Sequence, residues 1–91
     1  MSAIEVNKHP STLELHKLQV NKWARWEKGL SQLPQHYKNE ETCYILEGEA
    51  VVTMPDGSVV VLREGCLAKF PPGVECVWNI VRPVSKLYSC H

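Results

Sequence analysis

The chain has 91 residues, 44% of them hydrophobic, with ten basic and ten acidic side chains that leave no formal net charge. This length corresponds to a single domain, and the hydrophobic content excludes a disordered chain. Balanced charge without a basic stripe argues against a nucleic-acid partner. No apolar run is long enough to span a membrane, and the N-terminus does not resemble a signal peptide, so we expect a cytoplasmic protein.

The first segment of the chain is predicted to be an arm, residues 1–17, which precedes a β-barrel domain at 18–91. Ser11 or Thr12 is placed to cap a single helical turn over residues 13–18. The bulky apolar residues that follow, as far as Trp26, do not sustain a helical period and indicate extended chain.

Short strand-like runs alternate with turn signals from residue 31 onward. Pro55-Asp56-Gly57 is a strong turn signal, because proline presets its φ angle and glycine tolerates a positive one. Pro83 is expected to interrupt the last extended segment. Several short strands without a long helix predict an all-β barrel or jelly roll, in which closure protects the strand edges. The predicted strands cover residues 42–46, 50–54, 58–62, 66–70, 75–81 and 84–89.

Two segments of the chain resemble the paired motifs of the cupin superfamily. The first motif, G-x5-H-x-H-x3–4-E-x6-G, matches HYKNEETCYILEG through His36, Glu41 and Gly48. The second motif, G-x5-P-x-G-x2-H-x3-N, matches GCLAKFPPGVECVWNI at both glycines and the proline. The segments ETCYILEG and WARWEKG are more similar still to small single-domain cupins of the (S)-ureidoglycine aminohydrolase and ethanolamine-utilisation type. The resemblance covers residues 18–90.

This resemblance implies a cupin double-stranded β-helix, or jelly-roll barrel, in one domain, and a homodimer. In the wider superfamily, histidines and the glutamate hold a divalent metal inside the barrel. Pro34 and Cys76 stand here where two of the family's histidines are expected, and Ile80 replaces the final asparagine. Only His36 and Glu41 keep the family's ligand types.

The site then has two interpretations. In one, His36, Glu41 and Cys76 form a three-ligand metal site, and a thiolate among the ligands favours zinc over iron, nickel or manganese. In the other, the protein holds no cofactor: His36 lies at a pocket rim, Cys76 is a buried small residue, and Glu41 pairs with a nearby cation or hydroxyl. If no metal binds, Glu41 inside the barrel with His36 close by is a candidate catalytic acid–base pair, and in a metal enzyme the two residues are either ligands or acid–base groups.

Further candidate residues surround this motif. Strand alternation places Cys43 on the same face as Glu41, so its thiol is a candidate nucleophile if His36 activates it, and an inert buried thiol otherwise. Aromatic side chains either stack on a flat ligand or anchor the core. The predicted ligand-binding residues are Trp26, Cys43, Tyr44 and Trp78.

We therefore expect a cupin with a small-molecule pocket inside its barrel. Three functions remain open: a metal-assisted enzyme acting on a small amine- or carbonyl-bearing metabolite, a metal-free metabolite-binding module, and a purely structural dimer. In the third, the N-terminal arm would swap onto the sheet of a partner chain. The missing histidines count against carrying a metal-dependent activity over from the family.

Overall fold

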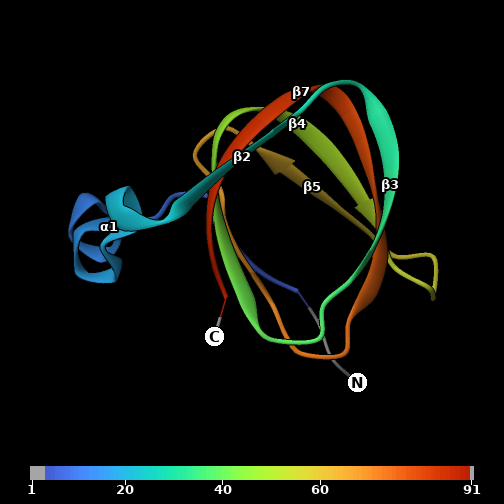
Figure 1. Cartoon of the computed structure of the whole chain (residues 1–91), viewed down its shortest axis with the longest axis horizontal. Coiled ribbons are helices and arrows are strands. Elements are labelled where there is room, and N and C mark those ends of the chain that lie inside the picture. The colour runs from blue at the N-terminus through green and yellow to red at the C-terminus, as the bar shows by residue number, and fades with distance from the viewer. Residues whose placement is uncertain (1–3, 91) are drawn as a thin grey trace.

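The computed structural model describes residues 4–90, which form one antiparallel sheet that curls into a barrel (Figure 1). The order of strands in the sheet is β1-β6-β4-β7-β2, with β3 also paired to β7 and β5 to β4. This arrangement confirms the all-β prediction. The elements are β1 (Glu5–Asn7), α1 (Thr12–Leu18), the short 3-10 helix η1 (Val20–Lys22), β2 (Ala24–Lys28), β3 (Ser31–His36), β4 (Glu41–Thr53), β5 (Val59–Arg63), β6 (Leu67–Phe70) and β7 (Glu75–Cys90).

The two long strands β4 and β7 pair along most of their length and form the centre of the sheet. Each was predicted as two shorter strands, because Gly48 and Pro83 were interpreted as breaks. The structure instead places both residues where the register of the β4–β7 pair shifts. Proline has no backbone N–H to donate to a regular ladder, and Pro83 is tolerated because the pairing is irregular at this point. Gly48 is required because its φ is 95° and a Cβ atom would collide with the Pro83 carbonyl.

The N-terminal segment adds a strand and a helix to this framework. Strand β1 pairs with β6 of the same chain, and helix α1 lies outside the barrel (Figure 1). The Ser11 hydroxyl accepts a hydrogen bond from the Glu14 backbone N–H at 3.0 Å, which confirms the predicted cap. Strand β3 was not predicted. Pro34 lies in its middle, but β3 pairs with β7 alone, and an edge strand tolerates proline.

Aromatic side chains fill the barrel interior. The rings of Tyr37 and Phe70 stack with centroids 4.4 Å apart, and Phe70 packs in turn on Trp78 at 5.8 Å. The Trp78 Nε1–H donates a hydrogen bond to the Tyr37 hydroxyl oxygen at 3.2 Å, so the polar atoms of the two rings are paired with each other. The interior of this barrel is therefore a packed core, and any ligand that enters it has to be small.

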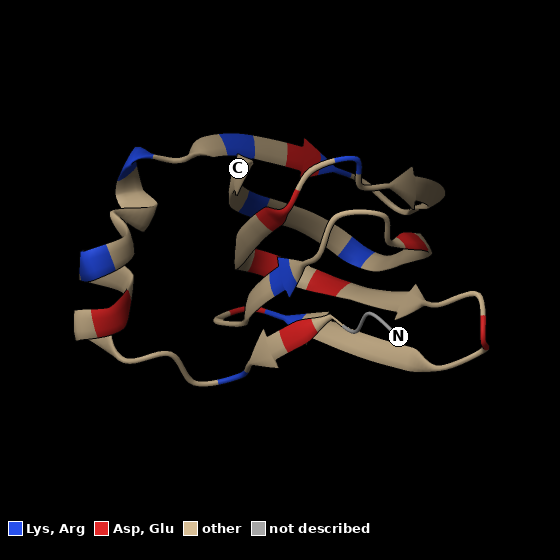
Figure 2. Cartoon of the chain, turned by 90° about the horizontal axis from the view of Figure 1, so that it is seen from below, with Lys and Arg blue, Asp and Glu red and all other residues tan. Residues whose placement is uncertain are grey.

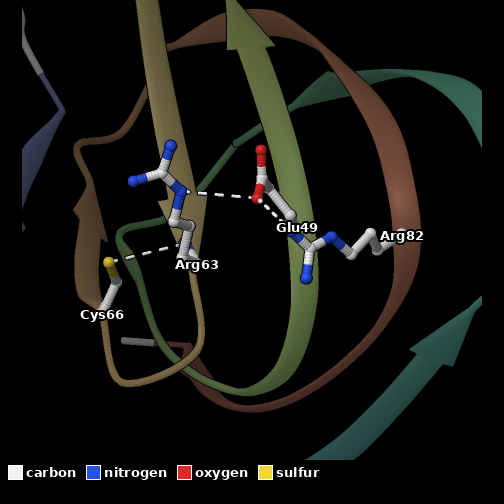
Figure 3. A network of polar contacts seen from close by, with 4 residues as sticks. All are labelled: Glu49, Arg63, Cys66 and Arg82. Atoms are coloured by element: carbon white, nitrogen blue, oxygen red, sulfur yellow. Dashed lines mark hydrogen bonds and ion pairs between the residues drawn. The ribbon is translucent and has the colours of Figure 1, made fainter.

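Charged residues of both signs are distributed over the strands, the turns and helix α1 (Figure 2). Glu49 of β4 pairs with Arg63 of β5 at 3.4 Å and with Arg82 of β7 at 3.7 Å, which links three strands (Figure 3). The Cys66 thiol accepts the Arg63 backbone N–H at 3.5 Å and closes the following turn. Both guanidinium groups are exposed, so these pairs contribute little to stability. No helix among residues 4–90 has the length and apolar character needed to cross a membrane.

Candidate functional site

The register of β3 against β7 decides which predicted residues face the barrel interior. Residues directly opposite in an antiparallel pair share a face of the sheet. His36 lies opposite Glu75, and both are exposed. Gln35 lies opposite Cys76, which is buried. The inward-facing residues at this end of β3 are therefore Gln35 and, next in alternation, the buried Tyr37.

The predicted alignment of His36 with a family histidine is thus displaced by one residue. If three residues instead of four precede Glu41, the two histidine positions of the first cupin motif fall on Gln35 and Tyr37, and Gly29 becomes its first glycine. A slip of one residue moves every side chain of a strand to the opposite face, so His36 and Pro34 lie on the outside.

The structure does not bring His36, Glu41 and Cys76 together. Across residues 4–90, no three His, Cys, Asp or Glu side chains lie close enough to hold a metal ion. His36 and Cys76 line one shallow groove of about 370 Å³ between β3, β4 and β7. Glu41 instead contacts Lys86 and Cys90.

Lys86 is the central residue of the interior, and sequence reasoning did not identify it. Its side chain is 8% exposed, and its Nζ lies 3.4 Å from Oε2 of Glu41, whose side chain is 15% exposed. The ammonium group also lies 4.4 Å from the ring centroid of Trp78, 4.8 Å from that of Trp26 and 5.8 Å from that of Tyr88. Three ring faces and one carboxylate therefore surround this cation.

The interior thiols are held in their protonated form. Burial raises the pKa of Cys43 to about 12 and that of Cys76 to about 11. Nucleophilic attack and zinc binding both require a thiolate. His36, the base expected to activate Cys43, lies on the outer face of β3. At the barrel end, the Cys90 thiol donates to Oε1 of Glu41 at 3.5 Å.

The predicted ligand-binding aromatic residues divide between the two faces of the sheet. Trp26 and Trp78 pack edge to face inside the barrel, with centroids 6.4 Å apart, and flank Lys86. Cys43 lies on the same inner face and is fully buried. Tyr44 follows Cys43 in the strand and so points outward, where it lines a groove of about 500 Å³ between the sheet and helices α1 and η1.

The family model of the EutQ-like cupin domain matches residues 15–88. The chain belongs to the EutQ-like cupins. A DUF861 family protein from Thermotoga maritima is 40% identical to it and superimposes with a TM-score of 0.94, over 98% of this chain and 100% of that one. The predicted cupin jelly roll and the predicted family are thereby confirmed. No curated protein matches the chain.

Two more distant structures share the fold alone. A putative ethanolamine utilization protein Q from Salmonella typhimurium is 21% identical, with a TM-score of 0.66, over 72% of this chain and 53% of that one. The EutQ protein of Clostridium difficile is 18% identical, with a TM-score of 0.68, over 74% and 52%. This chain thus covers about half the length of each of these two proteins.

The residues present in this EutQ-like cupin do not fit the divalent metal that the fold family implies. Glu41 is already paired with the Lys86 ammonium, and that positive charge repels a second cation at the same carboxylate. The Cys76 thiol is protonated, and His36 lies outside the barrel. The predicted homodimer, the cytoplasmic location and the domain boundary after residue 17 stay predictions.

Proposed function

We propose that this EutQ-like cupin binds a small metabolite bearing a carboxylate or carbonyl group inside its barrel, without a metal. The proposal depends on one observation: the Lys86 ammonium lies in the interior, 3.4 Å from Glu41 and enclosed by aromatic rings. A positive charge that belongs to the chain itself gives an incoming oxygen ligand the attraction that a bound cation gives in other cupins.

The remaining polar groups of the interior favour the same class of ligand. Lys86 carries only N–H donors, and the Cys43 and Cys76 thiols stay protonated. Burial raises the pKa of Tyr37 far above its usual value. The Tyr37 oxygen accepts from Trp78, which leaves its O–H to donate. A donor-rich interior with one carboxylate suits a ligand rich in acceptor oxygens.

The route of entry follows from the exposure of the site. Glu41 begins β4 and Cys90 ends β7, so both lie at one end of the barrel. Cys90 is exposed and Glu41 is half-buried, whereas Lys86 lies behind them. A ligand entering at this end meets Glu41 first and then the ammonium group between Trp26 and Trp78. The packed core beyond the ammonium group limits the ligand to a few heavy atoms.

The two other functions receive less support from the same residues. Metal-assisted chemistry on an amine- or carbonyl-bearing metabolite requires ligands that the interior does not assemble. A purely structural barrel has no need of a buried ion pair, because replacing such a pair with apolar residues is often neutral or stabilising. The Lys86–Glu41 pair is therefore better explained by ligand binding.

The proposal is tested by thermal unfolding of the protein with short carboxylates and keto acids, each compared with its alcohol or amine analogue. We expect at least one acid to raise the melting temperature, with a gain of about 2.7 kcal/mol at a hundredfold excess over Kd. A chelator should leave the shift unchanged. Lys86→Met should abolish it, while Lys69→Met, which removes a more exposed lysine paired with Glu40, should retain it.

Two outcomes would contradict this proposal. A shift that a chelator removes and added zinc restores would favour the metal-assisted enzyme. An unchanged melting temperature with every acid, for a protein that forms a dimer in solution, would favour the structural function.

A further inference from the structure

We infer that Lys86 is a carbonyl-capturing amine, which forms an imine with a small aldehyde or ketone that enters the barrel. This inference rests on the proposed function, because the carbonyl compound has to reach the interior before it can react. It adds a covalent step to that function and names the reacting atom, Nζ of Lys86.

The surroundings of Lys86 differ from those of every other lysine in the chain. It is the one buried lysine among seven, and its Nζ has a carboxylate oxygen at 3.4 Å. Burial favours the neutral, nucleophilic form of a lysine, and the carboxylate of Glu41 is close enough to take up the proton that the ammonium loses in the reaction. Lys69 also has a carboxylate partner, but its side chain is 45% exposed and its Nζ lies 3.7 Å from Glu40.

The reaction balances with the groups that are present. Glu41 accepts one proton from the ammonium, and the neutral amine attacks the carbonyl carbon to form a C–N bond. The second amine proton moves to the former carbonyl oxygen, which gives a carbinolamine. Glu41 returns its proton to the hydroxyl group, which leaves as water, and the C=N bond forms as a protonated imine. The sum is ammonium plus carbonyl giving iminium plus water, with no oxidant or reductant.

The rest of the interior supports this chemistry. The indole rings of Trp26 and Trp78 form two adjacent walls next to the ammonium, where they exclude water from an iminium and stabilise its charge. Cys43 and Cys76 do not compete for the carbonyl because burial keeps both thiols protonated. The nucleophile that the structure favours is therefore the lysine.

The test traps the imine chemically. The native protein is incubated with pyruvate or glyoxylate and sodium cyanoborohydride, which reduces an imine to a stable secondary amine, and the adduct is located by peptide mass mapping. We expect Lys86 to be labelled first among the lysines. Glu41→Gln should slow its labelling by about 10²-fold, as loss of a general base does. Lys69→Arg should leave labelling at Lys86 unchanged.

A matched pair of ligands separates this inference from the proposed function. Pyruvate and lactate share the carboxylate but only pyruvate has a carbonyl that an amine attacks, so we expect both to raise the melting temperature of the parent protein and only pyruvate to form the adduct. In the parent protein, lactate has no carbonyl to attack and should slow labelling by competition, a result that requires no variant to fold.

Three results would overturn the inference. A thermal shift of the parent protein with pyruvate and with lactate, without an adduct from pyruvate, would refute the imine and leave the proposed function intact. Adducts spread evenly over the surface lysines, unaffected by lactate, would refute it as well. If pyruvate produces no thermal shift and no adduct, both proposals are refuted.

Discussion

Replacing Lys86 with methionine removes the ammonium group and keeps most of the apolar stem, so it isolates the contribution of the buried charge. The Lys86 and Glu41 side chains are 8% and 15% exposed. Removing one member of a buried pair costs about 3–5 kcal/mol, because the other charge remains without compensation. We take about 3 kcal/mol, since Glu41 lies at the barrel end. In a domain of this size each kcal/mol lowers the melting temperature by about 4–8 °C, which gives a fall of about 12–24 °C.

The measurement is urea unfolding followed by circular dichroism, because the fluorescence of Trp26 and Trp78 changes with the substitution itself. Glu41→Gln should cost less than Lys86→Met, because the ammonium keeps its aromatic contacts. The double variant should recover to within about 1 kcal/mol of the parent, since no unpaired charge remains. A Lys86→Met variant with the same urea midpoint as the parent would refute a stabilising buried pair.

Two further predictions concern the backbone and the thiols. Gly48→Ala should lower the free energy of unfolding by more than about 3 kcal/mol, because its Cβ collides with the Pro83 carbonyl. Gly73→Ala, with φ of 87° and open space around it, should lower it by about 1–2 kcal/mol in the same urea assay. Equal losses would contradict the collision. The free energy of unfolding should also fall as pH rises from about 9 toward 12, because the Cys43 thiol ionises near 9 once unfolded but its pKa is about 12 in the folded protein. Cys43→Ala should make this decline less steep in urea unfolding across a pH series, and Cys76→Ala should reduce the slope less, because burial raises the Cys76 pKa only to about 11. A Cys43→Ala slope identical to that of the parent would exclude Cys43 as a cause.

The fold was largely predictable because its signals are local. Alternating β-formers mark β5 and β6, and the turn at Pro55-Asp56-Gly57 appears where it was predicted, with φ of 89° at the glycine. The prediction failed where the conformation of a residue depends on a strand that is distant in the sequence. Gly48 and Pro83 look like strand ends, but they lie at facing irregularities of two continuous strands. Whether such residues end a strand or form a bulge depends on the strand opposite.

The candidate site was harder to predict because a shift of one residue in the alignment changes the face of the sheet to which each side chain points. The cupin motif allows three or four residues before Glu41, and only the pairing of Gln35 with Cys76 decides between them. The sequence contains only a weak indication that Lys86 points inward: it lies two residues after Val84 in VSKLYS, and residues two apart in a strand share a face. A lysine in a strand is normally solvent-exposed. Its partner Glu41 is 45 residues away, so the pairing appears only in the folded chain.

The charges of the barrel interior balance one another at this end of the molecule. Glu41 carries the negative charge and Lys86 the positive charge of the inner face at this end, while burial keeps the Cys43 and Cys76 thiols neutral. The barrel is therefore neutral without any added ion. A divalent cation would add two positive charges beside Lys86 with one carboxylate to offset them, which is unfavourable in a poorly solvated space. A monoanionic ligand placed between Lys86 and the rings imposes a smaller charge imbalance, and an uncharged aldehyde or ketone imposes none. Under the proposed function, this charge balance would favour small oxygen ligands of low charge, which is also the class that an amine can capture.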